Sequence, residues 1–486
     1  MEKSYVKPFL FLKKTRFNFF LLFLVILVFL VVIKVNILTA PFHWDAMGYV
    51  IPAAENVYNK GVIINKTDST GHPPLFFIGL ALMWKIFGKS LLVSHLFNIF
   101  WGGLGLTFLF FLAKELYGKR VAVVATLLLA FNQIFFSQLG ILHLSTALTS
   151  MAILSVYSYI KQKYLLYIIA TSLMLLVKET TVVILLSILL FDFFLNLFKK
   201  EKLGVVFKRI GYLSLPGVSL LIWFFSHWLV TGWVFRTQAI VNKGSDFLYL
   251  CGEFFVRYLI YDFTIENVNK ANWIIFLLVV ISFVFLIKKR SFKYEILFLL
   301  IMVMNIAFFA YTDDMPRYFI IIFPFYLLMG AKASVMLTDG FKYRKIILIV
   351  ILLFMIGFSV MNYTGTRNTD GWRLESNMEY LDMVRLHQKV CKFIEENYSS
   401  YKILTRQPLN FELQNPWFGY VKKPIKIIKF KEFDNHNDVL VIWSSQSNFL
   451  DMRRFIEFSK KQLKMIKYFS YKGKIVKIFK KKDIRR

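Results

Sequence analysis

The sequence predicts a polytopic α-helical membrane protein that ends in a small α/β domain, and three observations carry this prediction. Of the 486 residues, 57% are hydrophobic, whereas apolar residues make up roughly 45–50% of a soluble domain. The first long apolar run, at 17–38, holds a charge only near its far end, and about 20 apolar residues span a bilayer core. Basic residues recur in every second loop between such runs.

The apolar runs predict about 11 spans, with boundaries defined to within a few residues. After the first run they cover 91–113, 121–138, 142–160, 164–177, 182–198, 210–230, 273–287, 296–311, 318–337 and 346–362. The run at 75–87 is short and follows two prolines, so we interpret it as an interfacial or re-entrant helix. The first run is too long for a signal peptide, and no small-residue cleavage site follows it.

Positive charge orients the chain, because Lys and Arg accumulate in cytoplasmic loops. The N-terminal segment carries Lys7, Lys13, Lys14 and Arg16. The basic loops after it lie at 114–120, 161–163, 199–209, 288–293 and 342–345. We therefore expect a multi-pass protein of the cell (cytoplasmic) membrane with a cytoplasmic N-terminus. The net charge of +31 belongs to this pattern, and no motif predicts a nucleic-acid partner.

The C-terminal part alternates helical and strand patterns and predicts a small α/β domain. A helical period covers 378–397, and short strand patterns cover 402–404, 426–430, 439–443 and 474–479. The composition changes near Thr364, which divides the chain into a membrane domain (1–363) and an extracytoplasmic domain (364–486). Cys251 and Cys391 are too few for a metal cluster, and a disulfide between them is left open.

The first outer loop, at 39–89, is the richest in groups that could carry chemistry. Asp45 follows the first span by a few residues, and a carboxylate beside apolar groups at the membrane surface is suited to act as a base. Glu55 lies on a short amphipathic segment with Tyr49. His72 precedes two prolines that fix an extended turn. In the alternative interpretation, Asp45 and Glu55 are solvated carboxylates and His72 has only a structural role.

Two later outer loops each place a cation at the same membrane depth. Lys178 and Glu179 follow one span, and Arg317 with Tyr318 begins another. Each could be an interfacial anchor. A lysine ammonium and an arginine fork, however, also suit a phosphate. Their shared face and depth favour the phosphate interpretation.

The chemistry that requires this set is glycosyl transfer from a polyprenyl-phosphate sugar. Cations stabilise the charge that grows on the departing phosphate, and a carboxylate takes the proton of the acceptor hydroxyl. No Gly-rich nucleotide loop is present. We therefore expect no cofactor and no metal, a lipid-linked donor, and a lipid, glycan or protein acceptor.

At these residues the chain resembles the GT-C membrane glycosyltransferases, in particular protein O-mannosyltransferases and lipid A aminoarabinose transferases. The resemblance covers about 18 to 340 and lies in WDAMGYV, GHPPLFF, KET and PRYFIIIFP, in that order. It implies a GT-C-like fold with outer-face interfacial helices within 52–87. The roles it implies are a catalytic carboxylate (Asp45), an acceptor and donor cleft (Tyr49, Glu55, His72, Glu179) and a phosphate site (Lys178, Arg317, Tyr318).

One departure from the family concerns the stretch after the third span. Many relatives carry an acidic residue there, whereas this chain reads LGILHLSTALTS. His143 or Ser145 could take its place. Two other interpretations stay open, namely a lipid or sugar transporter or flippase, and a catalytically inactive binding member of the same fold. A transporter places ionisable groups near the bilayer midplane, whereas here they gather at one surface.

Overall fold

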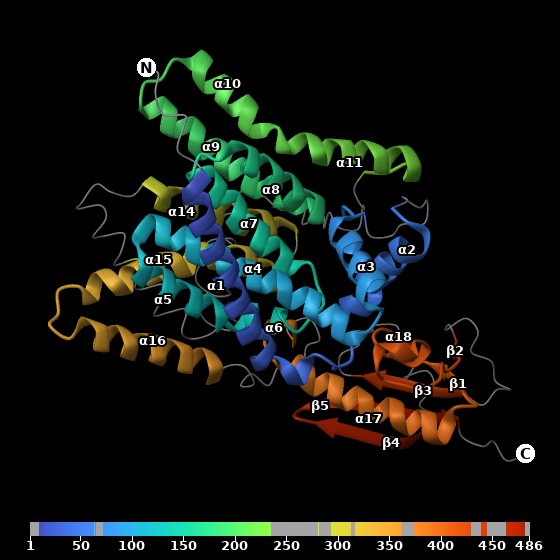
Figure 1. Cartoon of the computed structure of the whole chain (residues 1–486). Coiled ribbons are helices and arrows are strands. Elements are labelled where there is room, and N and C mark those ends of the chain that lie inside the picture. Colours follow the sequence, from blue (N-terminus) through green and yellow to red (C-terminus); the bar gives the residue numbers. More distant parts are fainter. Residues whose placement is uncertain are drawn as a thin grey trace, which may run out of the picture.

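The computed structural model describes residues 9–62, 64, 71–234, 280, 293–312, 316–361, 374–428, 439–444 and 463–481. A bundle of helices forms most of the molecule, and a helix-covered sheet lies at one end of it, beside α2 and α3 (Figure 1). The membrane-domain helices are α1 (Phe9–Ile33), α2 (Ile51–Lys60), α3 (Leu75–Phe87), α4 (Leu91–Tyr117), α5 (Lys119–Ala130), α6 (Gln133–Gln138), α7 (Ser145–Ile160), α8 (Tyr164–Val177), α9 (Val182–Phe198), α10 (Leu203–Ser214), α11 (Pro216–Thr231), α14 (Lys293–Thr312), α15 (Phe323–Thr338) and α16 (Arg344–Met361).

Short turns of helix connect these elements and carry several polar groups. They are η1 (Val35–Ile37), η2 (Ala46–Val50), η3 (Glu179–Thr181), η6 (Pro316–Ile321) and η7 (Leu374–Ser376). The η2 turn has π geometry, which occurs frequently at functional sites.

Two of the predicted spans are formed by two helices each. The run at 121–138 is divided into α5 and α6, because the Asn132 side chain accepts a hydrogen bond from the Phe135 N–H and starts a new helix. The run at 210–230 is divided into α10 and α11, which are bent by 49°. Pro216 begins the second of these helices, where its missing N–H is tolerated.

By length and composition, two of the described helical stretches could cross a membrane, namely Leu91–Tyr117 and Glu179–Phe198. A third is added if the bent pair of α10 and α11 counts as one span. Shorter apolar helices include Tyr164–Val177 and Phe323–Thr338. The figure of about 11 spans therefore stays a prediction, and the expected span at 273–287 lies outside the described residues.

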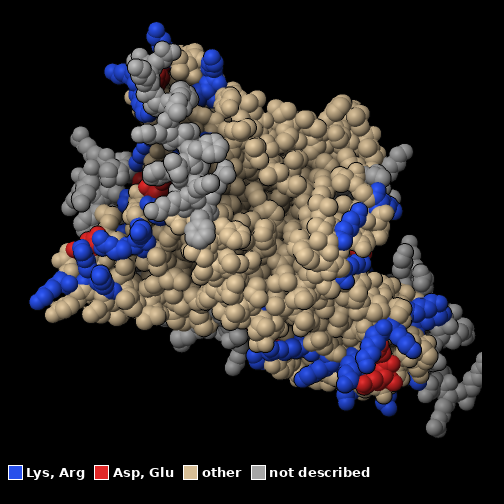
Figure 2. Space-filling model, viewed as in Figure 1, with Lys and Arg blue, Asp and Glu red and all other residues tan. Residues whose placement is uncertain are grey.

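The outer surface of the helical part is apolar over a broad band. Figure 2 shows Lys and Arg gathered toward the two ends of the face, with an uncharged region between them. Large apolar side chains are exposed on this part, for example Leu165 at 71% and Leu221 at 66%. Such a surface is unfavourable in water and is expected where helices contact lipid.

The loops that sequence charge assigns to the cytoplasm meet at one end of the bundle. Lys161 donates to Glu115 (2.7 Å), Tyr117 donates to Glu295 (2.7 Å), and Arg120 pairs with Asp339. The loops assigned to the outer face meet one another elsewhere, as described below. The side of the membrane on which these loops lie stays a prediction.

The C-terminal part is the α/β unit that the sequence predicts. It comprises α17 (Tyr380–Tyr398), α18 (Leu409–Gln414), η8 (Pro416–Phe418), β1 (Lys402–Leu404), β2 (Ile427–Ile428), β3 (Val439–Ser444), β4 (Leu463–Tyr471) and β5 (Lys474–Lys481). The sheet order is β2-β1-β3-β5-β4, with β1 parallel to both of its neighbours and the β3–β5 and β5–β4 pairs antiparallel. The prediction missed β4, an edge strand whose side chains are mostly exposed.

The C-terminal part binds directly to the loop that follows α1. The Phe42 N–H donates to the Phe418 carbonyl (3.3 Å), and the Tyr420 hydroxyl donates to the Phe42 carbonyl (2.8 Å). Gly419 has φ +93°, and a Cβ there would stand 3.2 Å from Pro41. A side chain at 419 would therefore be both strained and crowded. These contacts hold the start of the first outer loop in place.

Candidate active site

Asp45 lies at the start of the η2 turn, in the loop held by the C-terminal part. Ala46, Met47 and Val50 are fully buried, which fixes the turn against the core. Trp44 adopts a left-handed conformation (φ 37°) just before it, an uncommon backbone state for a bulky residue. The Asp45 side chain keeps 20% of its surface exposed.

Arg317 joins two carboxylates from distant parts of the chain. Its Nη2 donates to Asp45 Oδ2 (2.5 Å), and its Nη1 donates to Glu375 Oε2. The side chains of Arg317 and Glu375 are only 7% and 4% exposed. Burial raises the pKa of Glu375 to about 7, because desolvation of the carboxylate outweighs the favourable charge of Arg317.

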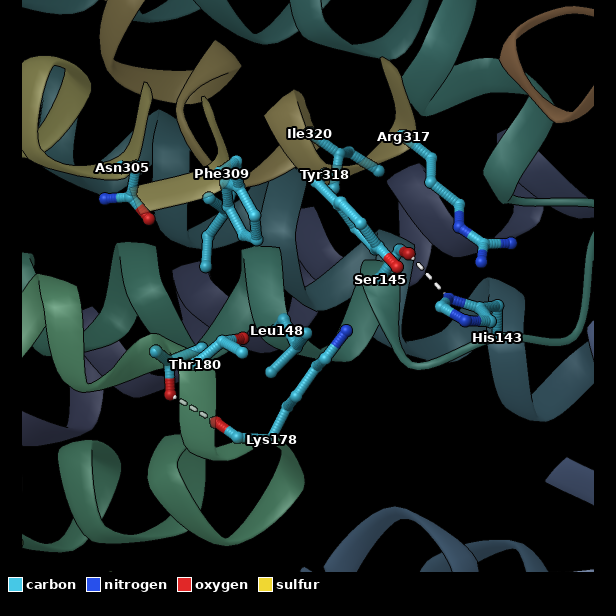
Figure 3. A pocket seen from close by; sticks show the side chains of 12 residues that line it. His143, Ser145, Leu148, Lys178, Thr180, Asn305, Phe309, Arg317, Tyr318 and Ile320 are labelled. Atoms are coloured by element: carbon cyan, nitrogen blue, oxygen red, sulfur yellow. Dashed lines mark hydrogen bonds between the residues drawn. The ribbon is translucent and has the colours of Figure 1, made fainter. Parts of the chain in front are cut away.

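Lys178 and Arg317 face one small cavity from opposite sides (Figure 3). The Lys178 ammonium lies 4.7 Å from the centroid of the Tyr318 ring, a cation–π distance. His143, Ser145 and other side chains complete the lining. The cavity volume is about 20 Å³, little more than one water molecule requires.

A buried hydrogen-bonded row crosses the site from the first outer loop to α7. The Tyr49 hydroxyl bonds His143 Nε2 (2.9 Å), and His143 Nδ1 bonds the Ser145 hydroxyl (2.7 Å). In a neutral imidazole one ring nitrogen donates and the other accepts. The stretch without a carboxylate thus contributes a histidine to the wall of the cavity.

A second pair, of His72 and Glu179, lies beside this row. His72 Nδ1 donates to the Glu179 carboxylate at 3.0 Å, and the Tyr49 ring contacts both histidine rings at centroid distances of 5.9 and 6.0 Å. The structure thus brings together seven of the eight predicted site residues. Five of them lie around Tyr49 and Arg317, and the Lys178–Tyr318 contact adds the other two.

Glu55 is the predicted residue that the structure places elsewhere. Its carboxylate pairs with Lys89, and both side chains are 30% exposed. The Lys89 ammonium lies over the Trp417 ring, 4.3 Å from its centroid. This pair belongs to the contact between α2, the start of α4 and the C-terminal part, and it shares no described contact with the Arg317 cluster.

Sequence reasoning missed Glu375. The residue is nearly 60 positions from Arg317 and carries no local motif. The chain returns it to the site through its backbone, since the Glu375 carbonyl accepts from the Ser137 hydroxyl (2.8 Å) and from Gln138 Nε2 (3.0 Å). These contacts with the end of α6, together with the ion pair to Arg317, place Glu375 at the site.

No grouping of three or more His, Cys, Asp or Glu side chains that could hold a metal ion occurs within the described part of the chain. The polar groups described above instead form ion pairs and hydrogen bonds with one another.

Comparisons with known proteins identify the fold. A family model for dolichyl-phosphate-mannose-protein mannosyltransferases matches residues 71–230. No curated protein matches the sequence significantly. Among solved structures, ArnT from Cupriavidus metallidurans in the apo state matches with a TM-score of 0.55 at 12% identity, over 93% of this chain and 97% of that chain.

Two further solved structures are similar. ArnT bound to undecaprenyl phosphate gives a TM-score of 0.50 at 11% identity, with the same coverage of the two chains. The apo oligosaccharyltransferase of Archaeoglobus fulgidus gives 0.48 at 12% identity, over 79% of this chain and 62% of that chain. The chain thus has the fold of ArnT over most of its length, and its residues 71–230 match the family model for dolichyl-phosphate-mannose-protein mannosyltransferases.

Proposed function

We propose that the chain transfers a sugar from a polyprenyl-phosphate donor to a hydroxyl of a lipid, glycan or protein at the outer membrane face. The observation that carries the proposal is the cavity between Lys178 and Arg317, next to the Asp45 carboxylate. Two cations and one carboxylate are the groups that a metal-independent displacement of phosphate by a hydroxyl requires.

The donor class follows from the charges and from the relatives. Buried cations favour an anionic ligand, and the apolar surface of the helices offers a place for a polyprenyl chain. The structurally similar ArnT was solved with undecaprenyl phosphate bound. The name of the family that matches residues 71–230 contains dolichyl-phosphate-mannose. A lipid-linked sugar phosphate is therefore the ligand that we assign to this cavity.

In this proposal Asp45 accepts the proton of the acceptor hydroxyl as the hydroxyl oxygen attacks the anomeric carbon. Lys178 and Arg317 stabilise the phosphate as its bond to the sugar breaks, with Tyr318 packed against the Lys178 ammonium. The Tyr49–His143 row and the His72–Glu179 pair line the cleft where sugar and acceptor meet.

Donor binding must rearrange the ion pairs of the resting site. Arg317 donates to both Asp45 and Glu375, and the cavity has no room for a sugar phosphate. A phosphate that takes the Nη2 donor of Arg317 releases Asp45, whose carboxylate then becomes free to accept a proton. Binding of the donor would thus precede activation of the base.

One observation favours an alternative function, in which the chain binds the lipid-linked sugar but does not transfer it. Asp45 is neutralised by Arg317 in the resting structure, and a carboxylate that stays paired cannot serve as a base. The two functions differ in whether sugar reaches an acceptor.

Mass spectrometry of membrane lipids and surface glycans, from cells with and without the chain, tests the proposed function. A transferase predicts one additional sugar on an acceptor when the chain is present, and accumulation of the lipid-linked sugar when it is absent. Identical lipid and glycan profiles in the two strains would contradict transfer and favour the binding-only alternative.

A further inference from the structure

The ion pair of Arg317 and Glu375 leaves two polar atoms without a hydrogen-bond partner among the described residues. They are Arg317 Nε, a donor, and Glu375 Oε1, an acceptor, and both are buried. Leaving a buried donor or acceptor unpaired costs about 1–3 kcal/mol and more for a charged group. Arg317 lines the cavity that we assign to the donor, and its ion pair holds Glu375 next to it. The two unpaired atoms therefore point to a ligand that supplies their partners.

The chemistry of the two atoms specifies the ligand. Arg317 Nε needs an acceptor, which a phosphate oxygen provides. Glu375 Oε1 needs a donor, and a phosphate diester at neutral pH carries none. A sugar attached to that phosphate does carry donors, in its hydroxyl groups. A sugar phosphate satisfies both atoms, because its sugar hydroxyls are permanent donors. A bare lipid phosphate is a monoester that is mostly doubly charged at neutral pH, so it satisfies the arginine and offers Glu375 mainly negative charge.

We infer that Glu375 binds a hydroxyl of the donor sugar and so helps to distinguish the sugar-carrying lipid from the bare lipid phosphate. This inference rests on the proposed function and adds a specificity residue to it. It also assigns a role to the segment that leads into α17, because that segment completes the donor site.

The surroundings of Glu375 hold it in position before any ligand arrives. Its backbone carbonyl is fixed by Ser137 and Gln138, and its Oε2 is fixed by Arg317. The side chain is only 4% exposed. A carboxylate with one oxygen anchored and the other unpaired is organised in advance for a directed hydrogen bond.

The test measures binding to the full-length chain in detergent. The probes are undecaprenyl phosphate and undecaprenyl phosphates that carry glucose, galactose or mannose. We expect wild type to bind at least one sugar-carrying lipid more tightly than undecaprenyl phosphate. In Glu375→Gln the amide oxygen turns toward Arg317, so the charged acceptor for the hydroxyl is lost. Affinity for the preferred sugar lipid should fall roughly tenfold or more, and affinity for undecaprenyl phosphate should change little.

Two further variants keep the result interpretable. Glu396→Gln alters a glutamate of α17 that is 59% exposed and pairs with Lys392, and it should bind both lipids as wild type does. Glu375→Asp keeps the negative charge but shortens the side chain by one methylene, so its carboxylate is drawn back from the sugar hydroxyl. It should show the same selective loss, and it replaces Glu375→Gln if that variant fails to fold.

The outcomes separate this inference from the proposed function. An equal loss of affinity for both lipids would make Glu375 only a support for Arg317 and would overturn the inference. Wild type without preference for any sugar-carrying lipid would overturn it as well. If wild type binds neither kind of lipid, the proposed function itself fails.

Discussion

At the scale of single residues, Arg317 holds the site together because a guanidinium has several donors in a fixed plane. One nitrogen contacts Asp45 and another contacts Glu375, from segments far apart in sequence. A lysine ammonium at this position could not serve both carboxylates and a phosphate in the same planar arrangement.

Arg317→Ala should weaken binding of undecaprenyl phosphate by about 1.5–3 kcal/mol, the value of a hydrogen bond to a charged group. Arg317→Lys should restore only part of this affinity, because the fork is lost. Binding to the purified chain measures both effects. Unchanged affinity in the alanine variant would remove Arg317 from the donor site.

Donor affinity should also depend on pH through Glu375. Its pKa is raised to about 7 by burial, so the carboxylate is charged above that pH and takes up a proton below it. A neutral Glu375 holds Arg317 less strongly and accepts a sugar hydroxyl less well. Affinity for the sugar-carrying lipid should therefore fall as pH decreases through about 7.

The control measures the affinity for the sugar-carrying lipid over the same pH series in Glu375→Gln, whose amide cannot take up this proton. Its affinity should be lower at high pH and flat across the interval. A pH dependence that persists unchanged in this variant would assign the titration to another group.

At the scale of elements, the contact between the C-terminal part and the first outer loop positions Asp45. Tyr420 donates to the Phe42 carbonyl, three residues before Asp45. The Phe42 ring also packs edge-on against Trp417, at a centroid distance of 5.2 Å. The η2 turn therefore depends on a segment more than 370 residues away.

Tyr420→Phe should lower the free energy of unfolding by about 1–3 kcal/mol, because it leaves a buried carbonyl without its donor. It should slow sugar transfer more than it weakens binding of undecaprenyl phosphate, since the displaced loop carries Asp45. Thermal unfolding, transfer rates and lipid binding measure the three quantities. Tyr468→Phe, on the 48% exposed Tyr468 of β4, is the control. Equal behaviour of the two variants would mean that the contact does not position the loop.

Several elements could be predicted from sequence because local pattern alone determines them. Apolar runs bounded by charge or by proline and glycine gave the bounds of α3, α8 and α9, and the strand pattern at 402–404 gave β1. Two predicted runs form two helices each, because the Asn132 cap and Pro216 break the helix where hydropathy continues. Hydropathy averages over such positions, whereas the backbone hydrogen bonds respond to each of them.

At the scale of the whole molecule, the two sets of loops lie apart and predict the sidedness of the chain. Basic loops meet around Arg120 and Glu295, and the loops with Asp45, Lys178 and Arg317 meet at the candidate site. A reporter active only in the cytoplasm, fused after Arg486, should be inactive. Activity of that reporter would contradict an extracytoplasmic C-terminal part. Thiol labelling of Cys391 would not decide the question, because that side chain is fully buried.

The face of the membrane on which each loop lies also explains which site residues could be predicted from the sequence. Asp45, Lys178 and Arg317 each follow or begin an apolar run on the same face, so membrane depth alone brings them near one another. Glu375 could not be predicted, because its position depends on how the chain returns to α6 after the last predicted span. A membrane restricts depth, but it does not specify which extramembrane segment folds back onto the site.

The central claim is that Asp45 is the base for sugar transfer, and Asp45→Asn tests it most directly. The asparagine keeps the size of the side chain but cannot accept the proton, and general-base help is typically worth ~10²–10⁴-fold. At matched membrane levels and with undecaprenyl phosphate binding retained, transfer to the acceptor should be at least about a hundredfold slower. Glu55→Gln, which alters the Lys89-paired carboxylate of the same loop, should transfer at nearly the wild-type rate. Near-full transfer by Asp45→Asn would contradict the assignment, and its combination with an inactive Glu55→Gln would move the base to Glu55.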